Sequence, residues 1–243
     1  MHSSILLALG AVVSAIAYTP ISTSRTPLDY NFANVPFDSH TAYFFLDYIE
    51  GVIDAIPDTA NKTSFLNASS TFLSAVRKLH TSNASYLPIT GFSQIAFSYG
   101  YPELSPYNKA FQHLISLNLL QPNTSGFYAG FEPLANEFPF IKRRYDASYN
   151  SEFFTLLDSH NVRRVVLSGV RTSGVIISTM RSLSDRDYVI HIVQDACLDS
   201  VDSTFLFETY FPTQAYVISL EEAIALLPKG PVDPKGQSGF NVS

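Results

Sequence analysis

The stretch VRRVVLSGVRTSGVIISTMRSLSDRDYVIHIV, residues 162–193, gives the clearest indication of the fold of this chain. A strand-like run at 162–167, apolar except for Arg163 and Arg164, is followed by helical spacing at 173–183 and by an apolar run at 188–193. Short continuous apolar runs are typical of strands that are buried on both faces of a parallel sheet. The stretch therefore predicts two parallel strands connected by a helix that packs on the sheet.

The same alternation extends outward along the chain. Further strands are expected at 41–46, within 86–97, at 138–142 and at 215–218. Further helices are expected at 65–79, 110–119, 152–159, 203–210 and 220–227. Repeated alternation of strands and helices predicts an α/β domain with a mainly parallel sheet covered by helices. Such sheets bind ligands outside the carboxyl ends of their strands.

Length and charge narrow the class of protein. The 243 residues suit one α/β domain, and 46% of them are hydrophobic, which is enough for a large core. A net charge of −6 and a pI near 5.4 argue against nucleic acid or an anionic membrane as partner. Cys197 is the only cysteine, so no intramolecular disulfide can form. We expect it to be a small buried residue.

The N-terminus predicts secretion. Residues 1–17 have the length of a signal peptide and end in Ala15-Ile16-Ala17, which fits cleavage before Tyr18. A buried N-terminal helix is the alternative. We expect an irregular arm at 18–37, the domain at 38–228, a loose tail at 229–243, and no membrane span in the mature chain. Glycosylation sequons agree with secretion and occur at Asn61, Asn67, Asn83, Asn123 and Asn241.

Three segments resemble the isochorismatase-like (cysteine hydrolase) family. They are HTAYFFLDYIEGVI at 40–53, FIKRRYDASYNSEFFTLL at 140–157 and LSGVRTSGVIISTMRSLSDRDYVIHIVQDAC at 167–197. The resemblance extends over about 41–218. It implies a three-layer α/β/α fold and a site of Asp, Lys and Cys at the strand ends. It also implies a small-molecule substrate and, in many members, a dimer or larger homo-oligomer.

Carried over residue by residue, the family's aspartate falls on Asp47 and its lysine on Lys142. The position of the nucleophilic cysteine falls on Val175, so the chain resembles a branch that lacks the thiol. The family's thiol-free members hydrolyse a vinyl ether by protonation and water attack. Some other members carry an Asp-x-His metal cluster, but His80 and His113 are isolated here. We therefore expect no metal site and no cofactor.

The residues themselves support a small site. A held Asp47–Lys142 pair can orient a water molecule or move a proton, although a purely structural ion pair is the alternative. Gly174 and Val175 are expected at a helix N-terminus, where free amides can hold an anion. We expect Thr172 or Ser173 to cap that helix.

Arg171 and Tyr145 are candidate substrate contacts, and each could equally be a surface residue. The leading hypothesis is a secreted hydrolase that acts on a small anionic or carbonyl compound without a covalent cysteine intermediate. The alternative is a catalytically inactive secreted glycoprotein that binds a ligand or partner in the retained pocket. A third hypothesis is an inert glycoprotein whose crevice is filled by apolar side chains.

Overall fold

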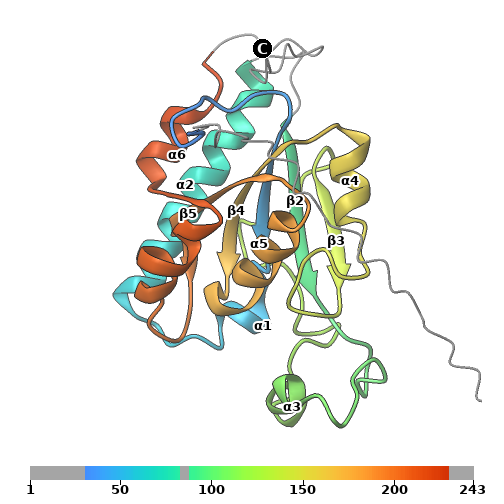
Figure 1. Ribbon diagram of the computed structural model, residues 1–243. Coiled ribbons are helices and arrows are strands. Elements are labelled where there is room, and N and C mark those ends of the chain that lie inside the picture. Colours follow the sequence, from blue (N-terminus) through green and yellow to red (C-terminus); the bar gives the residue numbers. More distant parts are fainter. Residues whose placement is uncertain (1–30, 83–87, 230–243) are drawn as a thin grey trace, which may run out of the picture. The chain divides into compact units, whose positions relative to one another are not determined.

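The computed structural model describes residues 31–82 and 88–229 (Figure 1). The predicted signal peptide at 1–17, most of the arm and of the tail, and the sequons at Asn83 and Asn241 lie outside these residues. The strands are β1 (Thr41–Leu46), β2 (Ile89–Ile95), β3 (Phe138–Lys142), β4 (Arg164–Val170), β5 (Val189–Leu198) and β6 (Tyr216–Ile218). The α-helices are α1 (Glu50–Ile53), α2 (Ala60–Ser82), α3 (Lys109–Ser116), α4 (Phe153–Ser159), α5 (Ile177–Ser184) and α6 (Leu220–Leu226). Shorter helical turns are η1 (Thr172–Ile176), η2 (Leu206–Tyr210) and η3 (Phe211–Thr213).

The six strands form one parallel sheet in the order β3-β2-β1-β4-β5-β6, which confirms the predicted parallel sheet. From β1 the chain first builds outward to β2 and β3. It then returns to the other side of β1 and builds outward through β4, β5 and β6. The direction of winding therefore reverses between β1 and β4, and open α/β sheets bind ligands at such a reversal.

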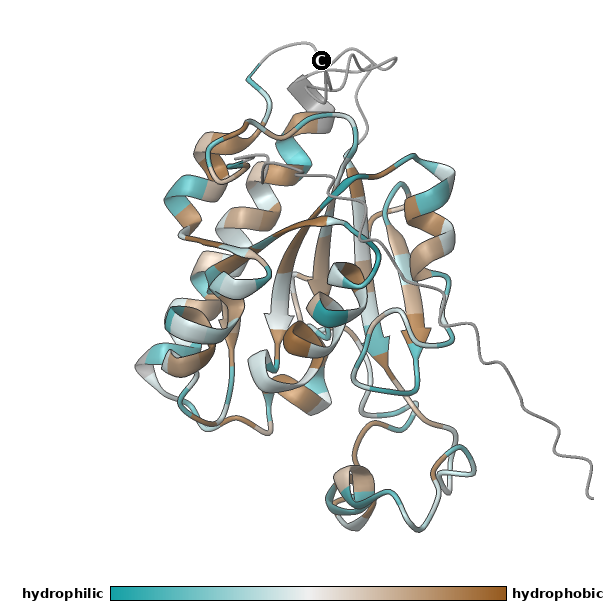
Figure 2. Ribbon diagram, in the orientation of Figure 1, coloured by the Kyte–Doolittle hydropathy of each residue, from teal (hydrophilic) through white to brown (hydrophobic). Residues whose placement is uncertain are grey.

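Alternate side chains of β1 enter two different cores. Tyr43 and Phe45 pack in the core that includes residues of α2 and α6, whereas Phe44 and Leu46 pack in the core with α4 and α5. Figure 1 shows these helix pairs on opposite sides of the sheet. Figure 2 shows hydrophobic residues along the strands between them. The three-layer α/β/α architecture is thereby confirmed, and it follows from the period of two in a strand buried on both faces.

Gly169 allows β1 and β4 to approach closely at their carboxyl ends. It lies opposite Leu46 in the register, with φ of +153°. A Cβ atom at this position would lie 2.3 Å from the carbonyl oxygen of Leu46, so no other residue fits without displacing one strand. The close approach brings Asp47, which follows β1, and Val170, which ends β4, to the same edge of the sheet.

The expected and observed elements differ mainly at their ends. β5 continues five residues past the expected end at 193, because Cys197 and Leu198 pair again with β4 after an irregularity. The expected helix at 173–183 opens with the π-helical turn η1, and the one at 203–210 contains the π-helical turn η2. α1 was not expected at all. No described helix is long and apolar enough to cross a bilayer.

His191 lies in the core of β5, as its place in an apolar strand predicts. Its side chain is fully buried, and Nε2 lies 3.3 Å from the carbonyl oxygen of Phe32. The ring packs against Phe37 and Tyr216, with centroid distances of 5.3 and 5.1 Å. Burial, together with the nearby charge of Arg164, lowers the pKa of His191 to about 4. The imidazole is therefore neutral in the folded protein at pH 7.

We predict that His191 makes the fold sensitive to mild acid. The unfolded chain takes up this proton near pH 6.5, whereas the folded chain resists it until about pH 4. Stability is thus present above pH 6.5 and is lost as pH falls through this window, by about 2 to 3 kcal/mol. His191→Phe should reduce the loss measured by urea unfolding at pH 7 and 4.5. Exposed His160 provides a control, since His160→Gln should lose as much unfolding free energy between pH 7 and 4.5 as the wild type. If wild type and His191→Phe lost the same unfolding free energy between these pH values, His191 would not be the source of the acid sensitivity.

Candidate functional site

A cavity of about 340 Å³ opens where the winding of the sheet reverses. It is lined by residues that follow β1 and β4, by the end of β2, by α3 and by the turn η1. Most of the wall is apolar. The polar side chains that reach it are those of Asp47, His113, Tyr145 and Arg171. The crevice is therefore open rather than filled, which counts against the third hypothesis.

Asp47 is fixed by the strand next to its own. It follows β1 directly, with φ of +57°, and its amide donates to the carbonyl oxygen of Ser93 at 3.1 Å. The Ser93 hydroxyl donates to Oδ1 of Asp47 at 2.7 Å, and the Ile95 amide also bonds the carboxylate. The left-handed backbone turns the chain sharply at the sheet edge, so the carboxylate stays beside β2 while bordering the cavity.

Lys142 ends β3, two strands away from Asp47 in the sheet. Its Nζ lies 2.7 Å from Oδ2 of Asp47 and donates to the carbonyl oxygens of Arg144 and Tyr145 at 2.9 Å each. An ammonium has three N–H groups, so all of them are used within the protein. The side chain is fully buried and does not line the cavity. The structure brings the two charged groups together, but it leaves Lys142 no donor for a substrate.

Burial raises the pKa of Asp47 above its ordinary value, because the buried carboxylate loses its hydration. The Lys142 ammonium and the hydrogen bonds from Ser93 and Ile95 oppose this effect and offset only part of it. Burial also lowers the pKa of Lys142. A carboxyl group whose pKa is raised toward the pH of the solution is suited to take up and release a proton. Asp47 is therefore the acid–base candidate of the cavity.

The turn η1 places Gly174 and Val175 on the cavity wall. Val175 is buried, and the amide of Gly174 donates to the carbonyl oxygen of Arg171 at 3.1 Å, so this amide is already engaged. The expected cap by Thr172 or Ser173 is wrong, since no side chain of the turn caps it. Instead, Oδ2 of Asp199 accepts the Ser173 amide at 2.6 Å. The peptide bond between Val170 and Arg171, just before the turn, is cis.

Arg171 and Tyr145 belong to segments that are far apart in the sequence, and both border the cavity. Tyr145 is 39% exposed, and its ring stacks on Phe111 at 4.7 Å between centroids. Arg171 is half-buried, and its guanidinium donates to the hydroxyl of Ser200. A substrate in the cavity can therefore contact the Tyr145 phenol and the Arg171 guanidinium.

Sequence reasoning missed His113. It lies on α3 and lines the cavity together with apolar neighbours from the same segment. Figure 1 shows α3 beyond the ends of β2 and β3. A separate apolar cluster that includes Phe97, Phe111 and Leu120 holds this segment in place. No local signal distinguishes His113 in the sequence, because its relation to Asp47 depends on the path of the whole 98–130 segment.

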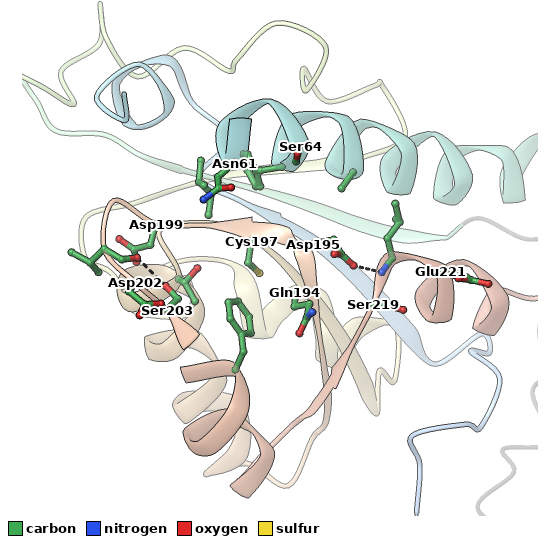
Figure 3. Close-up of a pocket in the computed structure, with 17 residues that line it drawn as sticks. Asn61, Ser64, Gln194, Asp195, Cys197, Asp199, Asp202, Ser203, Ser219 and Glu221 are labelled. Atoms are coloured by element: carbon green, nitrogen blue, oxygen red, sulfur yellow. Dashed lines mark hydrogen bonds between the residues drawn. The ribbon is translucent and has the colours of Figure 1, made fainter. Parts of the chain in front are cut away.

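Cys197 lies away from this cavity. It is a buried residue of β5, as expected, and burial raises its pKa to about 12. It borders a second hollow, of about 670 Å³, which shares no lining residue with the first (Figure 3). Within the described residues, no three His, Cys, Asp or Glu side chains are grouped so that they could hold a metal ion. The described sequon residues Asn61, Asn67 and Asn123 are exposed.

Comparison with known sequences gives the same assignment as the fold. A family model described as the isochorismatase domain matches residues 41–222. An uncharacterized isochorismatase family protein of Bacillus subtilis is 29% identical over 91 residues, which are 35% of this chain and 51% of that protein. The chain thus spans about half the length of this curated relative.

Solved structures share the architecture. A cysteine hydrolase from Pseudomonas syringae pv. phaseolicola aligns with a TM-score of 0.68 and 12% identity, covering 82% of this chain and 98% of that chain. N-carbamoylsarcosine amidase from Thermoplasma acidophilum aligns with a TM-score of 0.58 and 16% identity, covering 74% and 96%. Likeness at these identities shows the fold alone, whereas the family match spans most of the sequence. The chain belongs to the isochorismatase-like (cysteine hydrolase) family.

Proposed function

We propose that this protein is a secreted hydrolase that acts on a small compound with an anionic or carbonyl group and an apolar body, without a covalent cysteine intermediate. One observation carries the proposal. The Asp47 carboxyl borders an open cavity beside Val175, and burial raises its pKa. The cavity therefore holds a proton-transfer group next to the turn from which the family's nucleophile would act.

The lining supports this class of substrate. About 340 Å³ suits a small molecule, and the mostly apolar wall suits a hydrocarbon body. Arg171 can pair with a carboxylate or polarise a carbonyl oxygen, and Tyr145 can donate a hydrogen bond. Four polar groups on an apolar wall orient a ligand rather than solvate it.

Among the described residues that line the cavity, none is a serine, threonine or cysteine, which favours direct attack by water. Val175 presents only hydrocarbon, and Ser173 does not line the cavity. Cys197 lies in the other hollow, and a thiol with a pKa of about 12 is not ionised at neutral pH. We therefore assign the attack to a water molecule, with Asp47 as the group that transfers the protons.

Asp47 would supply the proton steps. In its acid form it donates a proton to the substrate, which for a vinyl ether goes to the terminal carbon and produces an oxocarbenium ion. Water adds to this cation and loses a proton to the Asp47 carboxylate, and the adduct divides into a carbonyl compound and an alcohol. Lys142 acts as a positioning residue, because its three bonds hold Asp47 in place and favour the return of the carboxylate form.

A non-catalytic binding protein is the second candidate. The observation in its favour is that the ion pair is fully satisfied within the protein, as a purely structural pair would be. In this case the same cavity would bind the ligand and release it unchanged.

The activity test compares wild type with Asp47→Asn, which keeps the shape of the side chain but removes its acid–base function. We expect turnover to fall by about 10²- to 10⁴-fold while ligand binding is kept. Purified protein would be incubated with a panel of vinyl ethers, esters and amides, and products would be followed by mass spectrometry. Equal turnover by both proteins would refute the role of Asp47. Saturable binding without any product would favour the second candidate.

The ion pair also makes a prediction for stability. Lys142→Met leaves a buried carboxylate without its cation and two carbonyl oxygens without a donor, which should destabilise the fold by about 3 to 5 kcal/mol. The Asp47→Asn/Lys142→Met double variant should recover part of this loss, since it no longer buries an unpaired charge. Urea unfolding of the four proteins of the cycle gives the coupling energy. If the two losses simply add, the groups do not act as a pair.

A further inference from the structure

The second hollow has walls of a different chemistry. It lies between the start of α2, the carboxyl half of β5, the segment after β5 and the start of α6 (Figure 3). Hydroxyl and amide side chains line much of it, namely Ser64, Gln194, Ser203 and Ser219. The Phe207 ring adds a flat apolar surface. Such walls suit an occupant that carries many hydroxyl groups on a compact ring.

Three of the four carboxylates that line this hollow, all but Glu221, already have partners. Asp195 accepts the Leu220 amide at 2.6 Å, and Asp199 accepts the Ser173 amide at the same distance. Asp202 accepts the amide and hydroxyl of Thr204. These carboxylates hold the starts of helical segments, so the hollow is not built as a cation site. Their remaining lone pairs can still accept hydrogen bonds from hydroxyl groups.

A buried hydroxyl also lacks a partner here. Thr172 is fully buried and borders the hollow, and its Oγ1 makes no hydrogen bond within the described residues. Buried polar groups are normally satisfied, so an occupant that reaches this oxygen would gain a hydrogen bond.

Asn61 connects this hollow to a modification signal. It begins the sequon Asn61-Lys62-Thr63 in the first turn of α2, and its exposed side chain lines the hollow. In Figure 3 its amide lies across the hollow from Gln194. Asn67 and Asn123 are also exposed sequon residues, but neither lines the hollow. One sequon of the described three therefore opens onto a polar hollow.

We propose that an N-glycan on Asn61 folds back onto the protein and that its first N-acetylglucosamine residues occupy this hollow. In the attachment step, Nδ2 of Asn61 forms a bond to the anomeric carbon of a lipid diphosphate-linked oligosaccharide. The sugar–phosphate bond breaks, the lipid diphosphate leaves with the electron pair, and the amide proton goes to the base of the transferring enzyme. The proposal rests on the secretion proposed above and not on catalysis in the Asp47 cavity.

A glycan in this place would stabilise the segment that follows β5. Residues 199–203 form part of the wall and hold the start of η1 through Asp199. Hydrogen bonds from sugar hydroxyls would tie this segment to α2. Its backbone amides should therefore exchange more slowly in the glycosylated protein.

The test uses the full chain secreted from a eukaryotic host. Glycopeptide mass spectrometry should find Asn61 occupied, and a peptide amidase that removes N-glycans should release it from native protein about tenfold more slowly than the Asn67 glycan. Thr63→Ala removes the Asn61 glycan but keeps the Asn61 side chain. It should speed amide exchange in 199–210 severalfold, whereas Asn67→Gln, on the same helix, should not.

The possible outcomes distinguish the glycan proposal from the proposed secretion. Modification of Asn67 and Asn123 without Asn61 would overturn it and leave secretion standing. An occupied Asn61 whose glycan is released as fast as that of Asn67, with unchanged exchange in Thr63→Ala, would also overturn it. A chain that is secreted with no modified sequon would overturn the glycan proposal alone, whereas a chain that the host retains in the cytosol without modification would also overturn the proposed secretion.

Discussion

The buried ion pair between Asp47 and Lys142 is the interaction on which the carboxyl edge of the sheet depends. It joins the end of β1 to the end of β3 across β2, and Ser93 of β2 bonds the same carboxylate. Two charges removed from water are tolerable only when nearly every lone pair and proton is engaged. Here the ammonium makes three bonds at 2.7 to 2.9 Å. Three strand ends are thereby fixed around one charge pair.

This arrangement assigns different tasks to the two residues. Lys142 is enclosed by protein oxygens, and its bonds to the carbonyl oxygens of Arg144 and Tyr145 set the path of the chain after β3. That path brings the Tyr145 ring to the cavity. Asp47 alone of the pair borders the open space. Lys142 therefore positions the site without lining the cavity, and the Asp47 carboxyl group is the member of the pair that contacts a ligand there.

Much of the framework could be predicted from short-range patterns. Continuous apolar runs predict the strands, and the resemblance predicts that Asp47, Lys142 and Val175 lie together at the strand ends. Two features could not be predicted, because they depend on contacts between distant segments. Asp199 caps the turn η1 from 26 positions away, where a local Thr or Ser cap was expected. His113 reaches the cavity only because an irregular segment of about thirty residues, 98–130, packs over the sheet edge.

The state of Cys197 has a practical consequence. The thiol is the only one in the sequence, it is buried, and it is very weakly acidic. Thiol–disulfide exchange needs an accessible thiolate, so this chain has neither a bridge to form nor a reactive sulfur to protect. Its native structure therefore requires no intramolecular disulfide. The same native structure can mature in an oxidising organelle or in a reducing bacterial cytosol, without help from disulfide isomerases.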